Sequence, residues 1–219
     1  MNHEVIGVVC DRIGALRLGH PVRVAVDGIT AAGKTTFAEG LAAELRSTRR
    51  RSVIRVSMDG FHHPRAVRYR QGRGSADGYY EDAYDFDAFR RNVLDPLSPS
   101  GDRRYRTAII DLATDEPVDE PLLDAQPEAI LIVDGSFLQK PRLQGAWDLV
   151  VYLQATFAAA EARGAARDAD ALGGIEAARQ TFRSRYHAAQ HRYLAECDPA
   201  AAADTVIDVE DPAHPRILR

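Results

Sequence analysis

Hydrophobic residues follow two alternating spacings along the chain, and together they predict an α/β fold. Short, mostly apolar runs predict buried strands at residues 22–26, 52–57, 129–134, 149–153 and 204–209. Apolar residues three or four positions apart predict helices at 4–18, 34–45, 157–170 and 175–197, with no element after residue 209. Strands that alternate with helices favour a doubly wound, mainly parallel five-stranded sheet with helices on both faces.

Residues 62–128 interrupt this alternation without forming a second domain. The segment is basic and polar at first, and it then predicts a short helix after Asp85 or Asp87. A hairpin is predicted between residues 104–112 and a piece around Val118. We therefore predict a single domain over residues 1–219, with an insertion at about 62–128 and a lid at about 160–175.

The first predicted strand runs directly into the pattern G-x-x-x-x-G-K-T. Gly28 and Gly33 allow backbone conformations closed to other residues, so that successive N–H groups turn towards an anion. The helix that begins at Lys34 adds a positive dipole end, the lysine adds a charge, and the Thr35 hydroxyl suits magnesium. We predict a loop that holds the phosphates of a nucleotide through Gly28, Ile29, Thr30, Ala31, Ala32, Gly33, Lys34, Thr35 and Thr36.

Two acidic residues follow predicted strands, at the edge where doubly wound sheets bind ligands. Asp59 comes after the strand at 52–57, which we expect to neighbour the first strand. A carboxylate across from Lys34 suits a base that takes a hydroxyl proton during in-line phosphoryl transfer. Asp134 ends the most apolar strand and suits a contact with magnesium-bound water or with Thr35. The alternative for Asp59 is a residue that caps a turn or holds a magnesium-bound water, and the alternative for Asp134 is a simple turn residue.

Arg163 and Arg167 lie four residues apart on the alanine-rich helix and therefore share a face. Guanidinium groups that close over a nucleotide offset the charge that develops during phosphoryl transfer. We predict that this pair belongs to the lid, with two ordinary surface arginines as the alternative.

Composition and net charge argue against several classes of protein. The 219 residues carry a formal net charge of −4 with a sequence pI near 6.0, which argues against a general nucleic-acid binder. Cys10 and Cys197 lie far apart and are predicted to be free thiols. No apolar run has the length of a membrane span and no signal-peptide pattern begins the chain, so we expect a cytoplasmic protein without membrane partners. A monomer and a homo-oligomer are both compatible with these totals.

In these motifs the chain resembles the uridine kinase and phosphoribulokinase family of P-loop kinases, which also includes bacterial pantothenate kinase. The resemblance extends from Val22 to Val209 in a consistent order. It rests on residues 28–36, 57–61, 133–135, 163–168 and 203–207.

The resemblance implies ATP-dependent phosphorylation of a primary alcohol with Mg²⁺, inside a P-loop fold whose insertion faces the substrate. It implies that Thr35 and Asp134 serve the metal and that the catalytic residues are Lys34, Asp59, Arg163 and Arg167. Candidate contacts with the small-molecule substrate are Asp59, His62, Tyr80, Asp85, Tyr105, Arg106 and Tyr186.

Parts of the uridine kinase pattern are missing from this chain. The Arg-Gly-Arg expected after the lid arginines is replaced by residues 171–173, Ala-Leu-Gly, and residues 105–110 lack the base-contacting histidine. Asp134-Gly135 stands where the family often has Glu-Gly. The acceptor is therefore predicted to be a nucleoside or, alternatively, a non-nucleoside such as pantothenate or a sugar. A nucleotide-dependent switch or assembly factor is a third hypothesis, which Asp59 and the missing N-K-x-D guanine signature disfavour.

Overall fold

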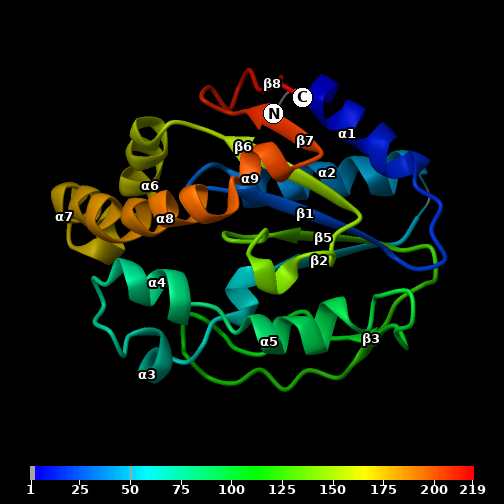
Figure 1. The fold of residues 1–219 in the computed structure, drawn as a ribbon, viewed down its shortest axis with the longest axis horizontal. Coiled ribbons are helices and arrows are strands. Elements are labelled where there is room, and N and C mark those ends of the chain that lie inside the picture. The colour runs from blue at the N-terminus through cyan, green and yellow to red at the C-terminus, as the bar shows by residue number, and fades with distance from the viewer. Residues whose placement is uncertain (1–2, 50) are drawn as a thin grey trace.

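A computed structural model describes residues 3–49 and 51–219, and it confirms the predicted α/β architecture (Figure 1). The main sheet has the strand order β2-β5-β1-β6-β7-β8. Its five parallel strands are β1 (Val22–Gly28), β2 (Val53–Ser57), β5 (Ile130–Asp134), β6 (Leu149–Gln154) and β7 (Thr205–Asp208). The prediction that no element follows residue 209 was wrong, because β8 (Arg216–Ile217) pairs antiparallel with β7.

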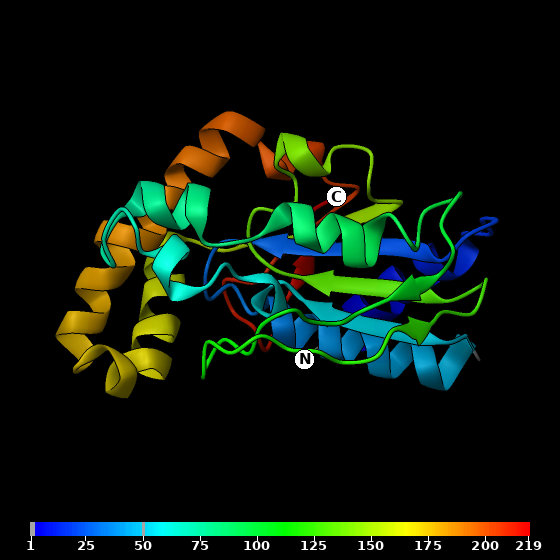
Figure 2. The ribbon, with the colours of Figure 1, turned by 90° about the horizontal axis from the view of Figure 1, so that it is seen from below.

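The strand order corrects the prediction that the strand before Asp59 neighbours β1. β5 lies between β1 and β2 and pairs in parallel with both. Asp134 therefore ends the strand that separates Asp59 from the loop after β1. In Figure 2 the strand arrows point towards the helices formed by residues 76–82 and 157–187, so the carboxyl ends of the strands face these helices.

Alternate side chains of the strands enter two separate cores, one on each face of the sheet. Val22, Val24 and Val26 pack with α1 (His3–Ala15) and α2 (Lys34–Arg49). On the opposite face the core includes residues of α4 (Ala76–Asp82), α5 (Phe86–Phe89) and α8 (Ala188–Cys197). Helices cover both faces, as the near-continuous apolar strands predict.

The helix predicted at 175–197 forms in three parts. α7 (Ile175–Thr181) leads into a π-helical turn (Phe182–His187), and α8 completes the segment. α6 (Phe157–Leu172) precedes them and ends at Gly173, which has a φ of 86°. A π-helical turn changes the direction in which the following side chains point, and such turns occur often at functional sites.

The insertion consists of short elements. α3 (Arg65–Arg68) and α4 come first, and a π-helical turn (Arg90–Leu94) continues α5. The predicted hairpin forms in part, because Ile110 and Pro117 form an antiparallel bridge and the Val118 N–H donates to the carbonyl oxygen of Ile109 at 2.9 Å. The first part of the predicted segment, β3 (Arg104–Tyr105), pairs instead with β4 (Leu123–Asp124). Three further helical turns are Met58–Phe61, Pro141–Leu143 and α9 (Pro199–Ala202). Within residues 3–49 and 51–219, no helix is both long and apolar enough to cross a membrane.

Candidate functional site

The phosphate-binding loop, residues 28–36, has the backbone shape that its glycines predict. Gly28 has a φ of 154°, and a Cβ atom there would lie 2.7 Å from the carbonyl oxygen of Leu153. Gly33 has a φ of 93° and Ala31 a φ of 65°, and α2 begins at the next residue, Lys34. The first N–H groups of a helix have no intrahelical partner, so this loop suits a phosphate group.

The Lys34 side chain folds back over the loop. Its Nζ donates a hydrogen bond of 2.8 Å to the carbonyl oxygen of Ile29. Burial lowers the pKa of Lys34, while the carboxylates of Asp27, Asp134 and Asp59 act in the opposite direction. All three acids therefore lie within electrostatic reach of the lysine, and phosphate charge at the loop would further favour its protonated form.

The Asp134 carboxylate connects the loop to β2. Its Oδ2 accepts a hydrogen bond of 2.6 Å from the Thr35 hydroxyl, and its Oδ1 pairs with Arg55 Nη2 at 2.7 Å. Asp134 is only 2% exposed. A buried carboxylate needs a counter-charge, and Arg55 supplies it to Asp134 beside the phosphate-binding loop.

The oxygen atoms of Thr35 and Asp134 fit Mg²⁺, which prefers hydroxyl, carboxylate, phosphate and water oxygens. Throughout the described chain, 3–49 and 51–219, no three or more His, Cys, Asp or Glu side chains are grouped to hold a metal ion. A magnesium ion at this loop would therefore take few protein ligands. Thr35 would contact it directly, Asp134 would act through water, and nucleotide phosphates would complete the shell.

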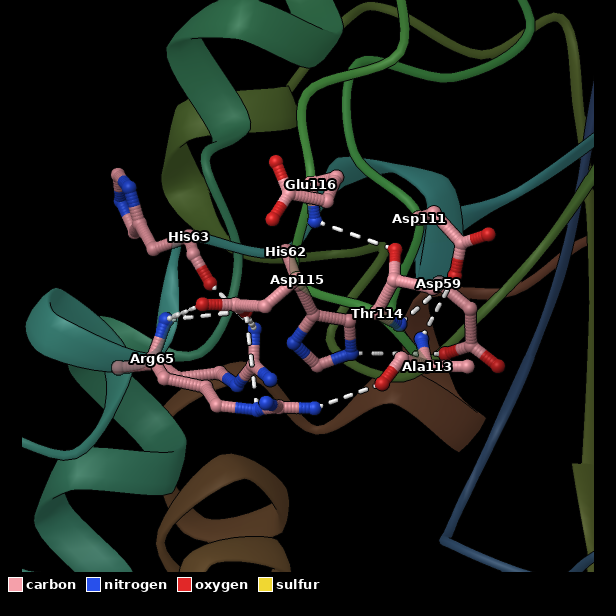
Figure 3. A network of polar contacts seen from close by, with 10 residues as sticks. Asp59, His62, His63, Arg65, Asp111, Ala113, Thr114, Asp115 and Glu116 are labelled. Atoms are coloured by element: carbon pink, nitrogen blue, oxygen red, sulfur yellow. Dashed lines mark hydrogen bonds and ion pairs between the residues drawn. The ribbon is translucent and has the colours of Figure 1, made fainter.

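Asp59 lies beyond the end of β2, on the turn Met58–Phe61. The Ser57 hydroxyl accepts a hydrogen bond of 3.3 Å from the Asp59 N–H and caps this turn. The Asp59 side chain is 68% exposed, and its Oδ1 lies 3.5 Å from His62 Nε2 (Figure 3). The His62 contact lowers the pKa of Asp59, so the carboxylate is ionised at neutral pH and can accept a proton.

Asp59 lines a cleft of about 550 Å³ that lies between the phosphate-binding loop, the insertion and the π-helical turn at 182–187. Thr30 reaches the cleft from the loop, and its hydroxyl oxygen lies 3.2 Å from that of Tyr79. Tyr186 packs edge-on against Tyr79, with ring centroids 5.0 Å apart. The cleft therefore places a carboxylate, aromatic rings and the phosphate-binding loop around one space.

The two predicted lid arginines have different surroundings. Arg167 lines the Asp59 cleft, and the charge of Asp59 acts on its pKa. Its guanidinium forms two hydrogen bonds with Asp168, at 2.7 and 2.8 Å. Arg163 instead donates to the carbonyl oxygens of Ala31, Val209 and Glu210. Arg163 thus joins α6 and the phosphate-binding loop to the segment that follows β7.

Three of the seven predicted substrate contacts line the cleft, namely Asp59, His62 and Tyr186. His62 is only 8% exposed, and its ring packs against Tyr84 with centroids 4.3 Å apart. Packing on Tyr84 therefore fixes the position from which His62 meets Asp59.

The other four predicted substrate contacts do not line this cleft. Tyr80 donates its hydroxyl to a glutamate of α8, and Asp85 caps α5 by accepting a backbone N–H. Tyr105 is buried in β3, and Arg106 pairs with an exposed aspartate 3.1 Å away. Tyr80 attaches the insertion to α8, and the other three residues have contacts within the insertion, so these side chains do not reach the cleft.

A buried polar cluster that was not predicted from the sequence lies behind the loop. Asp27 is fully buried, and its carboxylate accepts hydrogen bonds from the Tyr193 hydroxyl, Gln139 Nε2 and the Gly28 N–H. Burial raises the pKa of Asp27, and these donors act against it. The only sign of this cluster in the sequence was a polar residue, Asp27, in a mostly apolar strand just before Gly28, because its partners Tyr193 and Gln139 come from distant parts of the chain.

A second pocket, of about 420 Å³, lies on the other side of the loop. Gly33 and Thr36 border it from the loop and Arg163 borders it from α6. The segment after β7 contributes Val209, Pro212, Ala213 and Pro215. Its walls are mostly apolar and include Phe37, Leu153, Pro212 and Pro215. An apolar pocket next to a phosphate-binding loop suits the base of a nucleotide.

The chain is similar to known kinases in sequence and in fold. No protein-family model matches the chain. A pantothenate kinase of Rhodopseudomonas palustris is 35% identical over 133 residues, which make up 60% of this chain and 41% of that protein. The match thus spans about two fifths of the length of the curated relative.

Two solved structures show the same fold. A possible uridine kinase of Bacillus stearothermophilus has a TM-score of 0.73 at 24% identity, over 93% of this chain and 97% of its own. A candidate fructose transport system kinase of Silicibacter sp. has a TM-score of 0.70 at 22% identity, over 88% and 95%. The chain has the fold of the P-loop kinases, and the resemblance predicted from its motifs is confirmed. The names of these relatives refer to different small molecules, so the likeness does not define an acceptor.

Proposed function

We propose that this chain is an ATP-dependent phosphotransferase that moves the γ-phosphate to a hydroxyl group of a small molecule. The Asp59 carboxylate supports this function most directly. It is exposed and ionised, it lines a cleft beside the phosphate-binding loop, and its charge acts on Lys34. A nucleotide-dependent switch has no need for a proton acceptor in this position.

Each step of the proposed reaction has a residue in place. Lys34 and the loop N–H groups bind the phosphates, and the oxygen of the acceptor attacks the γ-phosphorus in line. Its proton passes to Asp59, while the bond between the γ-phosphorus and the bridging oxygen breaks and ADP leaves. Arg167 lies on the cleft side of α6, where its charge offsets that of the transferring group. A Mg²⁺ ion held beside Thr35 would supply further positive charge.

The apolar pocket bordered by Arg163 supports a nucleotide as donor. It lies against Gly33 and Thr36, so a base in this pocket leaves its phosphates at the loop. The acceptor then occupies the Asp59 cleft on the opposite side of Thr30. Separate pockets for donor and acceptor are what a transfer between two bound molecules requires.

A nucleoside acceptor is supported by the aromatic lining of the cleft. Tyr79, Tyr84 and Tyr186 all border it, and such rings stack on nucleobases. A non-nucleoside alcohol such as pantothenate or a sugar is supported by the missing base-reading residues in 105–110 and 171–173. ADP release measured against a panel of nucleosides, sugars and vitamins separates these acceptors.

Substitution of the proposed base tests the function itself. Asp59→Asn keeps the shape of the side chain and removes its basicity, so we expect kcat to fall by about 10²–10⁴-fold while ATP affinity changes little. Asp87→Asn, an exposed aspartate of α5, is the matched control and should retain wild-type kcat. Near-normal turnover in Asp59→Asn would reject Asp59 as the base. ATP hydrolysis that no alcohol stimulates would reject phosphotransfer to a small molecule.

A further inference from the structure

The acceptor cleft is strongly cationic, although the protein as a whole is acidic. Five arginines line it, and Asp59 is the sole carboxylate among its lining residues. A neutral hydroxylated acceptor offers nothing that would pair with so much positive charge. The arginines are Arg65, Arg68, Arg73, Arg167 and Arg185.

Three of these arginines already have carboxylate partners. Arg68 pairs with Asp115 at 2.7 Å. Arg65 lies 4.0 Å from the same carboxylate (Figure 3). Arg167 pairs with Asp168 at 2.7 Å. These three arginines therefore share two carboxylates of the protein, Asp115 and Asp168.

Arg185 has no such partner. It belongs to the π-helical turn and is only 9% exposed. Its Nε atom is buried without a hydrogen bond, and no carboxylate of the described residues lies within 4.0 Å of its guanidinium. Its close contacts are the faces of Tyr69, Tyr79 and Tyr186, at 5.4, 5.1 and 5.2 Å from the ring centroids. Burying a charge without a counter-charge is costly, so this guanidinium suits a ligand that brings one.

Tyr69 marks the centre of the positive region. The guanidinium groups of Arg68, Arg73 and Arg185 lie 5.1, 5.0 and 5.4 Å from its ring centroid. Burial acts to raise the pKa of Tyr69, but the hydrogen bond from Arg68 and the charges of the three arginines outweigh it and lower the pKa. Arg73 is exposed and also lacks a carboxylate partner among the described residues. Two uncompensated guanidinium groups thus flank one ring.

We propose that the acceptor carries an anionic group, a carboxylate or a phosphate, which Arg185 binds together with Arg73 while the acceptor hydroxyl faces Asp59. This inference rests on the proposed function, because it defines the class of molecule that is phosphorylated. Arginine donates two parallel N–H groups, which match the oxygen pairs of either anion. The anionic group would set the orientation of the acceptor, and the hydroxyl would then reach the base.

Binding of simple anions tests the site without assuming the reaction. The phosphate-binding loop is first saturated with Mg²⁺ and β,γ-methylene-ATP, so that an added anion cannot bind there. Inorganic phosphate and acetate are then titrated by calorimetry, which separates the two anion types. We expect at least one to bind, and Arg185→Gln to weaken that binding by about tenfold or more.

Two further variants make the binding result specific. Arg185→Lys retains a charge and should restore part of the affinity, whereas Arg179→Gln removes an exposed arginine of the preceding helix and should change nothing. The bound anion should also raise the pKa of Tyr69. An ultraviolet titration of the wild type should show this rise, and the same titration of Tyr69→Phe should not. If neither anion binds, or Arg185→Gln leaves the affinity of the bound anion unchanged, the proposal is overturned. It is equally overturned if Arg185→Gln weakens only the nucleotide analogue.

Turnover distinguishes this inference from the proposed function. ADP release is measured with hydroxylated carboxylates, hydroxylated phosphate esters and neutral polyols of similar size. We expect one anionic class to be phosphorylated, with Arg185→Gln raising its KM by about tenfold or more and changing kcat less. Phosphorylation of neutral acceptors alone would overturn the anion site and leave the phosphotransferase intact. Anion binding at Arg185 without phosphorylation of any acceptor would support the site and reject the phosphotransferase.

Discussion

The Thr35 hydroxyl donates a hydrogen bond of 2.6 Å to Asp134, so the first turn of α2 is attached to the end of β5. The other oxygen of this carboxylate pairs with Arg55 of β2 at 2.7 Å. β2 also leads into the turn that presents Asp59. One carboxylate therefore connects the element that binds phosphate to the element that carries the proposed base.

Asp134→Asn is predicted to affect both stability and the use of magnesium. The Arg55 side chain is 13% exposed and would lose its buried counter-charge, so we expect the free energy of unfolding to fall by about 3 kcal/mol. Loss of the carboxylate should also raise the Mg²⁺ concentration needed for half-maximal turnover. Urea unfolding and a magnesium titration measure the two effects.

The matched control for this prediction is Glu39→Gln. Glu39 is the second carboxylate that pairs with Arg55, at 3.1 Å, but its side chain is 59% exposed. Exposed ion pairs contribute little, so the free energy of unfolding should change by less than about 1 kcal/mol. Equal losses in the two variants would contradict the role assigned to the buried carboxylate.

The pH dependence of turnover should report the contact between His62 and Asp59. An ordinary aspartate has a pKa of about 3.9. Because the His62 contact lowers the pKa of Asp59, its carboxylate stays ionised at a lower pH than that of an ordinary aspartate. His62→Phe keeps a ring against Tyr84 and removes the nitrogen, so the pKa of Asp59 should rise. The acid limb of kcat/KM should then move to higher pH. His63→Phe is the control, because His63 faces Asp85 and not Asp59. If the acid limb moves in neither variant, or in both, His62 does not set the pKa of Asp59.

Strong local patterns explain how much of this architecture was predictable from the sequence. The loop at 28–36 was predictable because each of its marked residues has a local role. The glycines allow the backbone conformation, the lysine supplies a charge, and the threonine supplies a hydroxyl. The strand at 130–134 was predictable because burial on both faces requires apolar residues at every position. β8 was missed because two residues are too short to show a period.

Site residues that depend on tertiary contacts could not be predicted in the same way. Arg185 is one of several arginines in a polar helical segment, and only the π-helical turn and three tyrosines show that it is buried. Tyr105 and Arg106 lie in the expected segment, but hairpin pairing and a surface ion pair hold them in the insertion. Sequence order identifies a segment, whereas the direction of a side chain depends on what the rest of the chain places beside it.

Tyr193→Phe should weaken the support behind the phosphate-binding loop. The Tyr193 hydroxyl donates to Asp27, which is fully buried, and the loss of one donor should lower the free energy of unfolding by about 1–3 kcal/mol. Burial raises the pKa of Asp27 in the folded state, so its protonated form is favoured as the pH falls. A protonated carboxyl needs fewer donors, and the stability difference between wild type and variant should therefore shrink at low pH.

Urea unfolding at several pH values measures the Tyr193 effect. Tyr152→Phe provides the control, because Tyr152 is also buried and its hydroxyl has no hydrogen-bond partner among the described residues. It should change stability by less than about 0.5 kcal/mol. A Tyr193→Phe difference that grows towards low pH would contradict the hydrogen bond to an ionised Asp27.

Glycine at position 164 allows α6 to approach the phosphate-binding loop. A Cβ atom there would overlap the Phe182 ring and lie 2.9 Å from the Cβ atom of Ala31. Gly164→Ala should therefore lower the free energy of unfolding by about 1–3 kcal/mol and raise the KM for ATP, because Ala31 belongs to the loop. Gly7→Ala is the matched control within α1. A Cβ atom at Gly7 meets nothing within 4 Å, so alanine should stabilise the helix by about 0.5–1 kcal/mol. If the two substitutions change the free energy of unfolding in opposite directions, the space beside α6 determines the effect rather than helix propensity. Stabilisation in both variants would mean that α6 does not pack against the loop.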